Sequence, residues 1–318
     1  MSNRSMYSVV VPTYQGQDTI RSLAQQIDAF FGAAGVPYEV IFVNDCGPDF
    51  SWRVMQEVQR ELGADKVKIV RLARNFGQHN ALICGFSHAQ GNFVVTMDED
   101  LQHRPVDIGL LITAQAEGDF DVVYGRYDTL QHSGFRNITS QMMKRLLQLG
   151  IPDLHPDYTA FRLIRAQTAR YCLDMSNSYT FLDGYLTWIT RSVTSVPVVH
   201  QERAVGESSY TVRKLLEHSV NIFVTFSDLP VRLLSLISVV VFILTSFYSI
   251  YIFLRKLFFN DLSSGFPSLI ITLGFGIGLL LLGMGILGEY IHRINLKTTR
   301  RPNFVESSPV SDSTKIFS

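Results

Sequence analysis

The chain has 318 residues, of which 47% are hydrophobic and 18% are charged, and its 28 Lys and Arg residues balance 28 Asp and Glu residues. This composition excludes a disordered chain, and the zero net charge excludes a nucleic-acid binder that works through a global positive field. Three widely spaced cysteines, Cys46, Cys84 and Cys172, form neither a disulfide framework nor a zinc motif and fit a reducing compartment.

Apolar runs and helical patterns alternate over the first half of the chain. Tyr7–Val11 is typical of a strand buried on both faces, and Asp18 is placed to cap the helix that follows it. This alternation predicts βαβ units and a mostly parallel sheet. Further strands are predicted at Tyr38–Val43, Val67–Leu72, Phe93–Met97, Asp121–Tyr124 and Phe161–Ile164, and further helices at Trp52–Leu62, His79–Ala89, Val106–Glu117 and Phe135–Leu149.

Acidic residues follow the predicted strand at Phe93–Met97, and ligands of such sheets bind beyond the carboxyl ends of the strands. Residues two apart in an extended chain point the same way, so Asp98 and Asp100 are expected to face one ligand while Glu99 faces elsewhere. Paired carboxylates repel unless a cation lies between them, and Mg²⁺ or Mn²⁺ binds carboxylates together with phosphate oxygens. Gln102 is placed to join this shell. The alternative is an acidic loop that caps the next helix.

Two long runs near the C-terminus, Leu233–Leu254 and Leu262–Gly288, contain no charged residue. Each is long enough to cross a bilayer core, which predicts a hairpin of transmembrane helices at about 233–254 and 266–288. A buried pair of core helices is the alternative. Lys and Arg are concentrated outside the hairpin, so both termini are expected in the cytoplasm, and the N-terminus has no apolar signal-peptide core.

These patterns divide the chain into four parts. A cytosolic α/β domain is expected over residues 1–208 and the membrane hairpin over 232–292. Residues 209–231 are predicted to form amphipathic helices at the membrane surface, with packing against the soluble domain as the alternative. Residues 293–318 are expected to form a cytoplasmic tail that is mobile from Val305 onward.

Several motifs follow one another in order: Arg74–Ala81, Met97–Gln102, Asp157–Leu163, Glu202–Tyr210 and Gly285–Ile291. Together they resemble family 2 glycosyltransferases of the GT-A fold, and within that family the membrane-anchored polyisoprenyl-phosphate glycosyltransferases. This branch includes dolichol-phosphate mannose synthase, bacterial undecaprenyl-phosphate glucosyltransferases and the transferase that loads formamido-arabinose onto undecaprenyl phosphate. The resemblance covers residues 7–304.

The resemblance implies an inverting transfer of one sugar from a nucleotide sugar to undecaprenyl or another polyprenyl phosphate. The reaction would occur at the cytoplasmic face of the bacterial inner membrane, in cell-envelope glycan synthesis or lipid modification. It would use Mg²⁺ or Mn²⁺, with UDP favoured over GDP and the sugar left open. Relatives form tetramers, which suggests a homo-oligomer, and no nucleic acid is involved. A processive polysaccharide synthase and a non-catalytic membrane scaffold are the alternatives.

Roles for individual residues also follow from the resemblance. Arginines suit phosphate groups because their planar fork binds two oxygens at once. Asp157 is expected either to act as a base or to orient the acceptor or a cationic side chain, because a phosphate acceptor is already largely ionised near neutral pH. The expected metal ligands are Asp98, Asp100 and Gln102; the donor-binding residues are Pro12, Tyr14, Asp45, Asp98, Arg126 and Arg203; the acceptor-phosphate residues are Arg136, Arg203 and Ser208; and the catalytic residues are Asp100 and Asp157.

The chain departs from the pattern of its relatives at three places, one of which is Asn44-Asp45-Cys46-Gly47, where relatives usually have Asp-Asp-Gly-Ser. Gln15-Gly16 stands where relatives usually have Asn-Glu, which leaves a backbone contact to the nucleotide but removes the side-chain contact. Ser209 stands where relatives commonly have Lys, so one cation near the lipid-phosphate pocket is missing.

Overall fold

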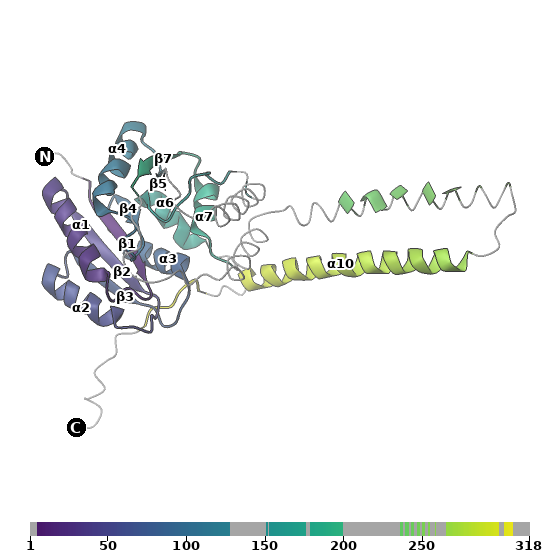
Figure 1. The fold of residues 1–318 in the computed structure, drawn as a ribbon, viewed down its shortest axis with the longest axis horizontal. Helices are drawn as coiled ribbons and strands as arrows, with labels where there is room; N and C mark the ends of the chain where they lie inside the picture. Colours follow the sequence, from purple (N-terminus) through teal and green to yellow (C-terminus); the bar gives the residue numbers. More distant parts are fainter. Residues whose placement is uncertain are drawn as a thin grey trace, which may run out of the picture.

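The computed structural model describes residues 5–127, 151, 153–175, 179–199, 265–298 and 302–307, together with scattered positions between 236 and 258. Figure 1 shows an α/β domain from which one long helix, α10 (Phe266–Thr298), projects. The expected helix at Phe135–Leu149 and the juxtamembrane segment 209–231 lie outside the described residues.

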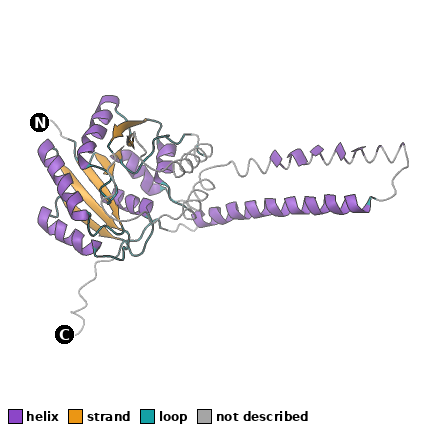
Figure 2. Ribbon diagram, in the orientation of Figure 1, coloured by secondary structure: helices purple, strands orange, loops and turns teal. Residues whose placement is uncertain are grey.

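The domain is built on a sheet of seven described strands in the order β3-β2-β1-β4-β6-β5-β7, with helices on both faces (Figure 2). The strands are β1 (Tyr7–Thr13), β2 (Tyr38–Asn44), β3 (Val67–Arg71), β4 (Phe93–Thr96), β5 (Val122–Tyr127), β6 (Arg162–Arg165) and β7 (Val193–Val198). The helices are α1 (Ile20–Ala34), α2 (Ser51–Leu62), α3 (Gln78–His88), α4 (Ile108–Gly118), α6 (Ala166–Tyr171) and α7 (Leu182–Ile189), with short 3₁₀ turns η1 (Pro105–Asp107) and η2 (Cys172–Asp174).

Strand β1 is buried on both faces of the sheet, which explains why its sequence is apolar without interruption. All seven of its residues are buried. Val9 and Val11 belong to the core under α1, α2 and α4, while Val10 belongs to the core under α3, α6 and α7. Burial of one such side chain contributes about 1.5–3 kcal/mol, so the strand is held from both faces. Helix α1 begins at Ile20 as its apolar spacing predicts, but its N-cap residue is Thr19 rather than Asp18.

The predicted mostly parallel sheet is confirmed, with one exception. Strands β1, β2, β3 and β4 pair in parallel, which brings their carboxyl ends to one edge. Strand β6 is antiparallel to both β4 and β5. Strand β5 therefore runs in the same direction as β4, and its end at Arg126 and Tyr127 reaches the same edge as the acidic residues after β4.

The membrane hairpin is not confirmed. Only scattered positions of the first uncharged run are described, and α10 covers most of the second. Within the ranges that the structure describes, no helix combines the length and the apolarity that crossing a membrane requires.

The expectation of a mobile tail from Val305 is wrong for residues 305–307. These residues lie against the outer edge of β3, where the Ala73 amide donates to the Val305 carbonyl at 2.8 Å and the Ser307 amide donates to the Arg71 carbonyl at 2.7 Å. Phe304 packs against the core on the α3 side of the sheet. The edge of a sheet offers backbone hydrogen-bonding groups to any segment that reaches it, and here the segment after α10 uses them.

Candidate active site

The loop after β4 is a tight turn that fixes the direction of Asp98. The Asp98 amide donates to Nδ1 of His103 at 3.2 Å, and Nε2 of Gln78, the first residue of α3, donates to the Asp98 carboxylate at 2.6 Å. The Gln102 amide donates to the Asp100 carboxylate at 3.1 Å. Leu101, between them, has a φ of 61°, a left-handed conformation that is uncommon for leucine. Such conformations cluster at functional sites.

Asp98 and Asp100 act on a common neighbour, Tyr127 at the end of β5. The pKa of Tyr127 is raised, mainly by burial and further by the negative charges of Asp98 and Asp100. The His103 ring stacks between Tyr127, at 6.0 Å, and Phe161, at 5.1 Å. Both carboxylates therefore lie near Tyr127, and paired carboxylates are ligands that Mg²⁺ or Mn²⁺ takes together with phosphate oxygens.

Glu99 points to the neighbouring loop after β1. Its carboxylate accepts hydrogen bonds from the amide of Tyr14 at 3.2 Å and from the amide of Gln15 at 3.1 Å. Burial raises the pKa of Glu99, and these two hydrogen bonds oppose that rise. A Cβ atom added at Gly16 would lie 2.2 Å from Oε2 of Glu99. The carboxylate therefore fills the space that a side chain at residue 16 would occupy.

Sequence reasoning missed this role of Glu99. The available signal was the absence of a side chain at Gly16 together with a third carboxylate, Glu99, between the paired aspartates.

Asp45 shapes the loop between β3 and α3. It is only 4% exposed, and its two carboxylate oxygens accept the amides of Phe76 at 2.7 Å and Gly77 at 2.8 Å. Burial raises the pKa of Asp45, and both hydrogen bonds lower it. The side chain expected to contact the nucleotide thus holds the backbone of the Arg74–Ala81 motif in place.

The other expected donor-loop residues lie at the end of β1. Pro12 is buried in the strand opposite Val43, while Tyr14 is 41% exposed beyond it. A Cβ at Gly47 would lie 1.7 Å from the Tyr14 carbonyl oxygen, so only glycine permits the loops after β1 and β2 to approach this closely.

Asp157 lies beside a cation. One of its carboxylate oxygens is 3.5 Å from the Arg126 guanidinium and accepts a hydrogen bond from the Ser195 hydroxyl at 2.8 Å. Of its two expected roles, the geometry favours orientation of a cationic side chain. Arg126 is 43% exposed, so its guanidinium is accessible at the same edge of the sheet as Asp98.

A buried polar network lies beneath the carboxyl edge of the sheet. Sequence reasoning did not identify it. The Arg162 guanidinium forms an ion pair with Asp183 and donates from Nε to the Thr96 hydroxyl at 3.0 Å. The Tyr124 hydroxyl donates to Asp183 at 2.9 Å. Both charged side chains are at most 4% exposed, and they join β4, β5 and β6 just before the site.

The structure therefore brings together the loops that carry Tyr14, Asp45, Asp98 and Asp100, and places Gln102 and Arg126 at the same edge. Three of the expected residues, Arg136, Arg203 and Ser208, lie outside the described residues.

Comparisons with known proteins show the family of this chain. The family described as Glycosyl transferase family 2 matches residues 8–174. The undecaprenyl-phosphate 4-deoxy-4-formamido-L-arabinose transferase of Klebsiella pneumoniae subsp. pneumoniae is 32% identical over 300 residues, which are 93% of this chain and 91% of that protein. The protein of the same name from Erwinia tasmaniensis is 33% identical over 314 residues, which are 97% and 96% of the two chains.

Solved structures show the same fold. Mannosyl-3-phosphoglycerate synthase from Rubrobacter xylanophilus superposes with a TM-score of 0.52 at 14% identity and covers 69% of this chain and 72% of its own. Glucosyl-3-phosphoglycerate synthase from Mycobacterium tuberculosis, in complex with Mn²⁺, UDP-glucose and phosphoglyceric acid, superposes with a TM-score of 0.51 at 18% identity and covers 71% and 79%. At these identities the likeness concerns the fold alone.

Proposed function

The chain belongs to glycosyl transferase family 2 and is a glycosyltransferase, and from this premise we propose that it transfers one sugar, with inversion, from a nucleotide sugar to a polyprenyl phosphate. The transfer takes place at the cytoplasmic face of the bacterial inner membrane. Relatives that match nearly the whole chain are named for undecaprenyl phosphate, which supports this acceptor. Their names also make a 4-deoxy-4-formamido-L-arabinose donor the first to test.

The observation that carries the proposal is the position of Asp98 and Asp100 on the tight turn at the carboxyl edge of the sheet, where Gln78 donates to Asp98 and the Gln102 amide donates to Asp100. Two carboxylates suit Mg²⁺ or Mn²⁺, and Gln102 is placed on the same turn. When bound there, the ion would stabilise the negative charge of the departing nucleotide diphosphate. A solved structure of the same fold that contains Mn²⁺ and UDP-glucose supports this choice of cofactor.

The remaining side chains bind and orient the substrates. Tyr14 and the loop held by Asp45 line the donor side, and the Arg126 guanidinium is held by Asp157 for a phosphate group. A phosphate monoester has a second pKa near 6, so the acceptor oxygen is ionised near pH 7 and attacks without a base. Asp157 then contributes by fixing Arg126, and direct displacement inverts the sugar carbon.

The membrane location rests on the sequence and on the surface of α10. The two uncharged runs suit a hairpin that holds the site at the depth of the lipid phosphate. Along α10, Leu273, Leu280 and Leu287 are each more than half exposed. Such a continuous apolar surface marks contact with lipid or with another protein. Residues 1–208 would then face the cytoplasm.

The test is incubation of the purified full-length protein with undecaprenyl phosphate, Mn²⁺ and a panel of UDP- and GDP-sugars, with lipid products identified by mass spectrometry. The proposal expects a lipid that carries a single sugar from one donor. A long glycan would favour a processive synthase. Binding of nucleotide sugar that is independent of the metal, without transfer, would favour a scaffold.

A further inference from the structure

A second group of side chains that could hold a metal ion includes two residues in the C-terminal half of α3 and takes no part in the proposed reaction. Cys84 and His88 stand four residues apart on α3, so they share one face of the helix. Glu306 reaches them from the segment after α10. Its Oε1 lies 2.8 Å from Nε2 of His88 and 3.8 Å from Sγ of Cys84.

The spacing of these atoms suits a tetrahedral ion. The three ligand atoms all lie within 4.8 Å of one another. Around zinc, with bonds of about 2.0–2.3 Å, neighbouring ligand atoms would be about 3.4–3.6 Å apart. Shifts of about 1 Å in flexible side chains therefore close the shell. A thiolate, an imidazole and a carboxylate form a mixed donor set that suits Zn²⁺ and does not suit Mg²⁺.

Backbone contacts independent of any ion hold Glu306 in place. It forms an antiparallel bridge with Leu72, and its neighbours Val305 and Ser307 pair with the end of β3. The third ligand is thus fixed opposite α3 before metal arrives. Because Glu306 is 222 residues from Cys84, the cysteine spacing in the sequence gives no sign of the group.

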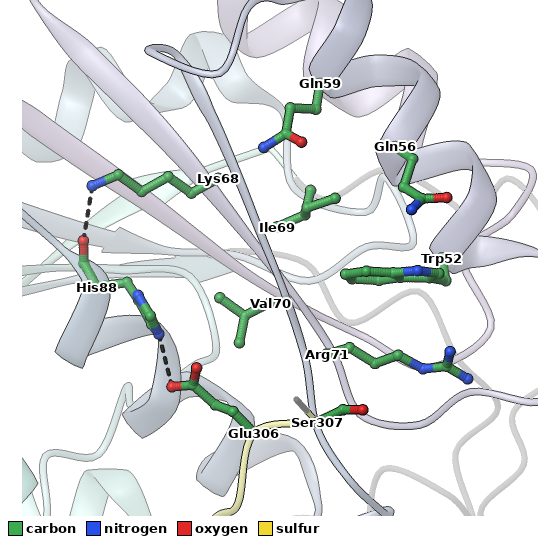
Figure 3. A pocket seen from close by; sticks show the side chains of 10 residues that line it. All are labelled: Trp52, Gln56, Gln59, Lys68, Ile69, Val70, Arg71, His88, Glu306 and Ser307. Atoms are coloured by element: carbon green, nitrogen blue, oxygen red, sulfur yellow. Dashed lines mark hydrogen bonds and ion pairs between the residues drawn. The ribbon is translucent and has the colours of Figure 1, made fainter. Parts of the chain in front are cut away.

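The group is also accessible. His88 and Glu306 line a pocket of about 650 Å³ along the outer edge of β3, whose wall includes Lys68, Arg71 and Trp52 (Figure 3). The side chains of His88 and Glu306 are 35% and 43% exposed, while Cys84 is fully buried behind them. An ion can enter from the pocket and meet the thiol last, and water from the pocket can supply a fourth ligand.

We propose that Cys84, His88 and Glu306 form a zinc site that fastens the segment after α10 to helix α3. Helix α3 begins at Gln78, which contacts Asp98, so the ion joins the region beyond the uncharged runs to an element of the candidate active site. Burial and the Glu306 charge raise the pKa of the Cys84 thiol. Zinc therefore displaces a proton when it binds, and its affinity rises with pH.

The test uses the full-length Asp100→Asn protein, which weakens the other candidate cation site, after treatment with a chelator. Zinc stoichiometry and affinity are measured by competition with a chromogenic chelator, and Co²⁺ is added as a spectroscopic probe of thiolate ligation. The proposal expects one zinc per chain and a thiolate-to-cobalt absorption band. Cys84→Ser removes the band, and both Cys84→Ser and Glu306→Gln weaken zinc binding at least tenfold.

Cys172→Ser is the matched control, because Cys172 is also a buried cysteine and its thiol donates to the backbone carbonyl of Thr168 at 3.6 Å. This variant should bind zinc like the parent. Substoichiometric zinc, or zinc binding that survives both Cys84→Ser and Glu306→Gln, would overturn the proposal. Glu306→Gln changes an exposed side chain, so its result stands even if Cys84→Ser fails to fold.

Discussion

The contact between Glu99 and the loop after β1 gives the sharpest prediction about donor binding. Glu99→Ala removes the carboxylate that accepts the amides of Tyr14 and Gln15. A hydrogen bond to a charged group contributes about 1.5–3 kcal/mol, and the partly solvated loop recovers some of that from water. If the ordered conformation of the loop loses about 2 kcal/mol of stabilisation, nucleotide-sugar binding weakens by the same free energy, which corresponds to roughly a 30-fold rise in KM.

The assay is steady-state transfer with varied nucleotide sugar, compared among variants that separate charge from space. Glu99→Gln keeps one acceptor oxygen and should lose less than Glu99→Ala. Because a side chain at residue 16 enters the same space, the double variant Glu99→Ala with Gly16→Glu should recover part of the loss. Glu117, exposed on α4, provides the control Glu117→Ala. An unchanged KM in Glu99→Ala would refute this reasoning.

The remaining predictions concern the Arg162–Asp183 ion pair, the role of Asp157 and the stability of the protein in acid. Arg162→Met strands a buried carboxylate at Asp183 and should lower the free energy of unfolding by about 3–5 kcal/mol; denaturant unfolding measures this, and adding Asp183→Leu should recover part of it. Asp157→Asn should raise KM while leaving the pH profile of kcat unchanged, whereas loss of the acidic limb of that profile would show that Asp157 is a base. The contacts of Lys66 and Tyr38 lower the pKa of Asp28 below 3.8. The ionised Asp28 carboxylate therefore stabilises the fold at any pH above the pKa that Asp28 has in the unfolded chain. This stabilisation is lost as the pH falls through the lower pKa that Asp28 has in the folded protein. Thermal unfolding should show Asp28→Asn less stable than the parent at neutral pH, and the difference should shrink in acid.

Local patterns predicted the part of the site that depends on strand ends. The uninterrupted apolar strand β1 and the acidic run after β4 were enough to place Asp98 and Asp100 at the edge of a parallel sheet. Those features follow from the alternation of side chains along a strand and from the common direction of parallel strands.

Contacts between distant segments could not be predicted in this way. The antiparallel insertion of β6 depends on pairing with β4 and β5, and the Arg162–Asp183 ion pair depends on that insertion. Docking of Glu306 beside β3 requires the chain to return after α10. The role of Asp45 as a support for the Phe76 amide is likewise a contact between two loops, and neither loop's sequence alone specifies it.

The most direct test of the account is transfer to undecaprenyl phosphate by Asp100→Asn, measured as sugar–lipid product at saturating Mn²⁺. Asp153→Asn is the control, because the Asp153 side chain is 56% exposed and forms an ion pair with Arg191, which is also exposed. The account predicts a loss of at least 100-fold in Asp100→Asn, comparable with the removal of one stabilising group in other active sites, and near-normal transfer in Asp153→Asn. Near-normal, metal-dependent transfer by Asp100→Asn would contradict it.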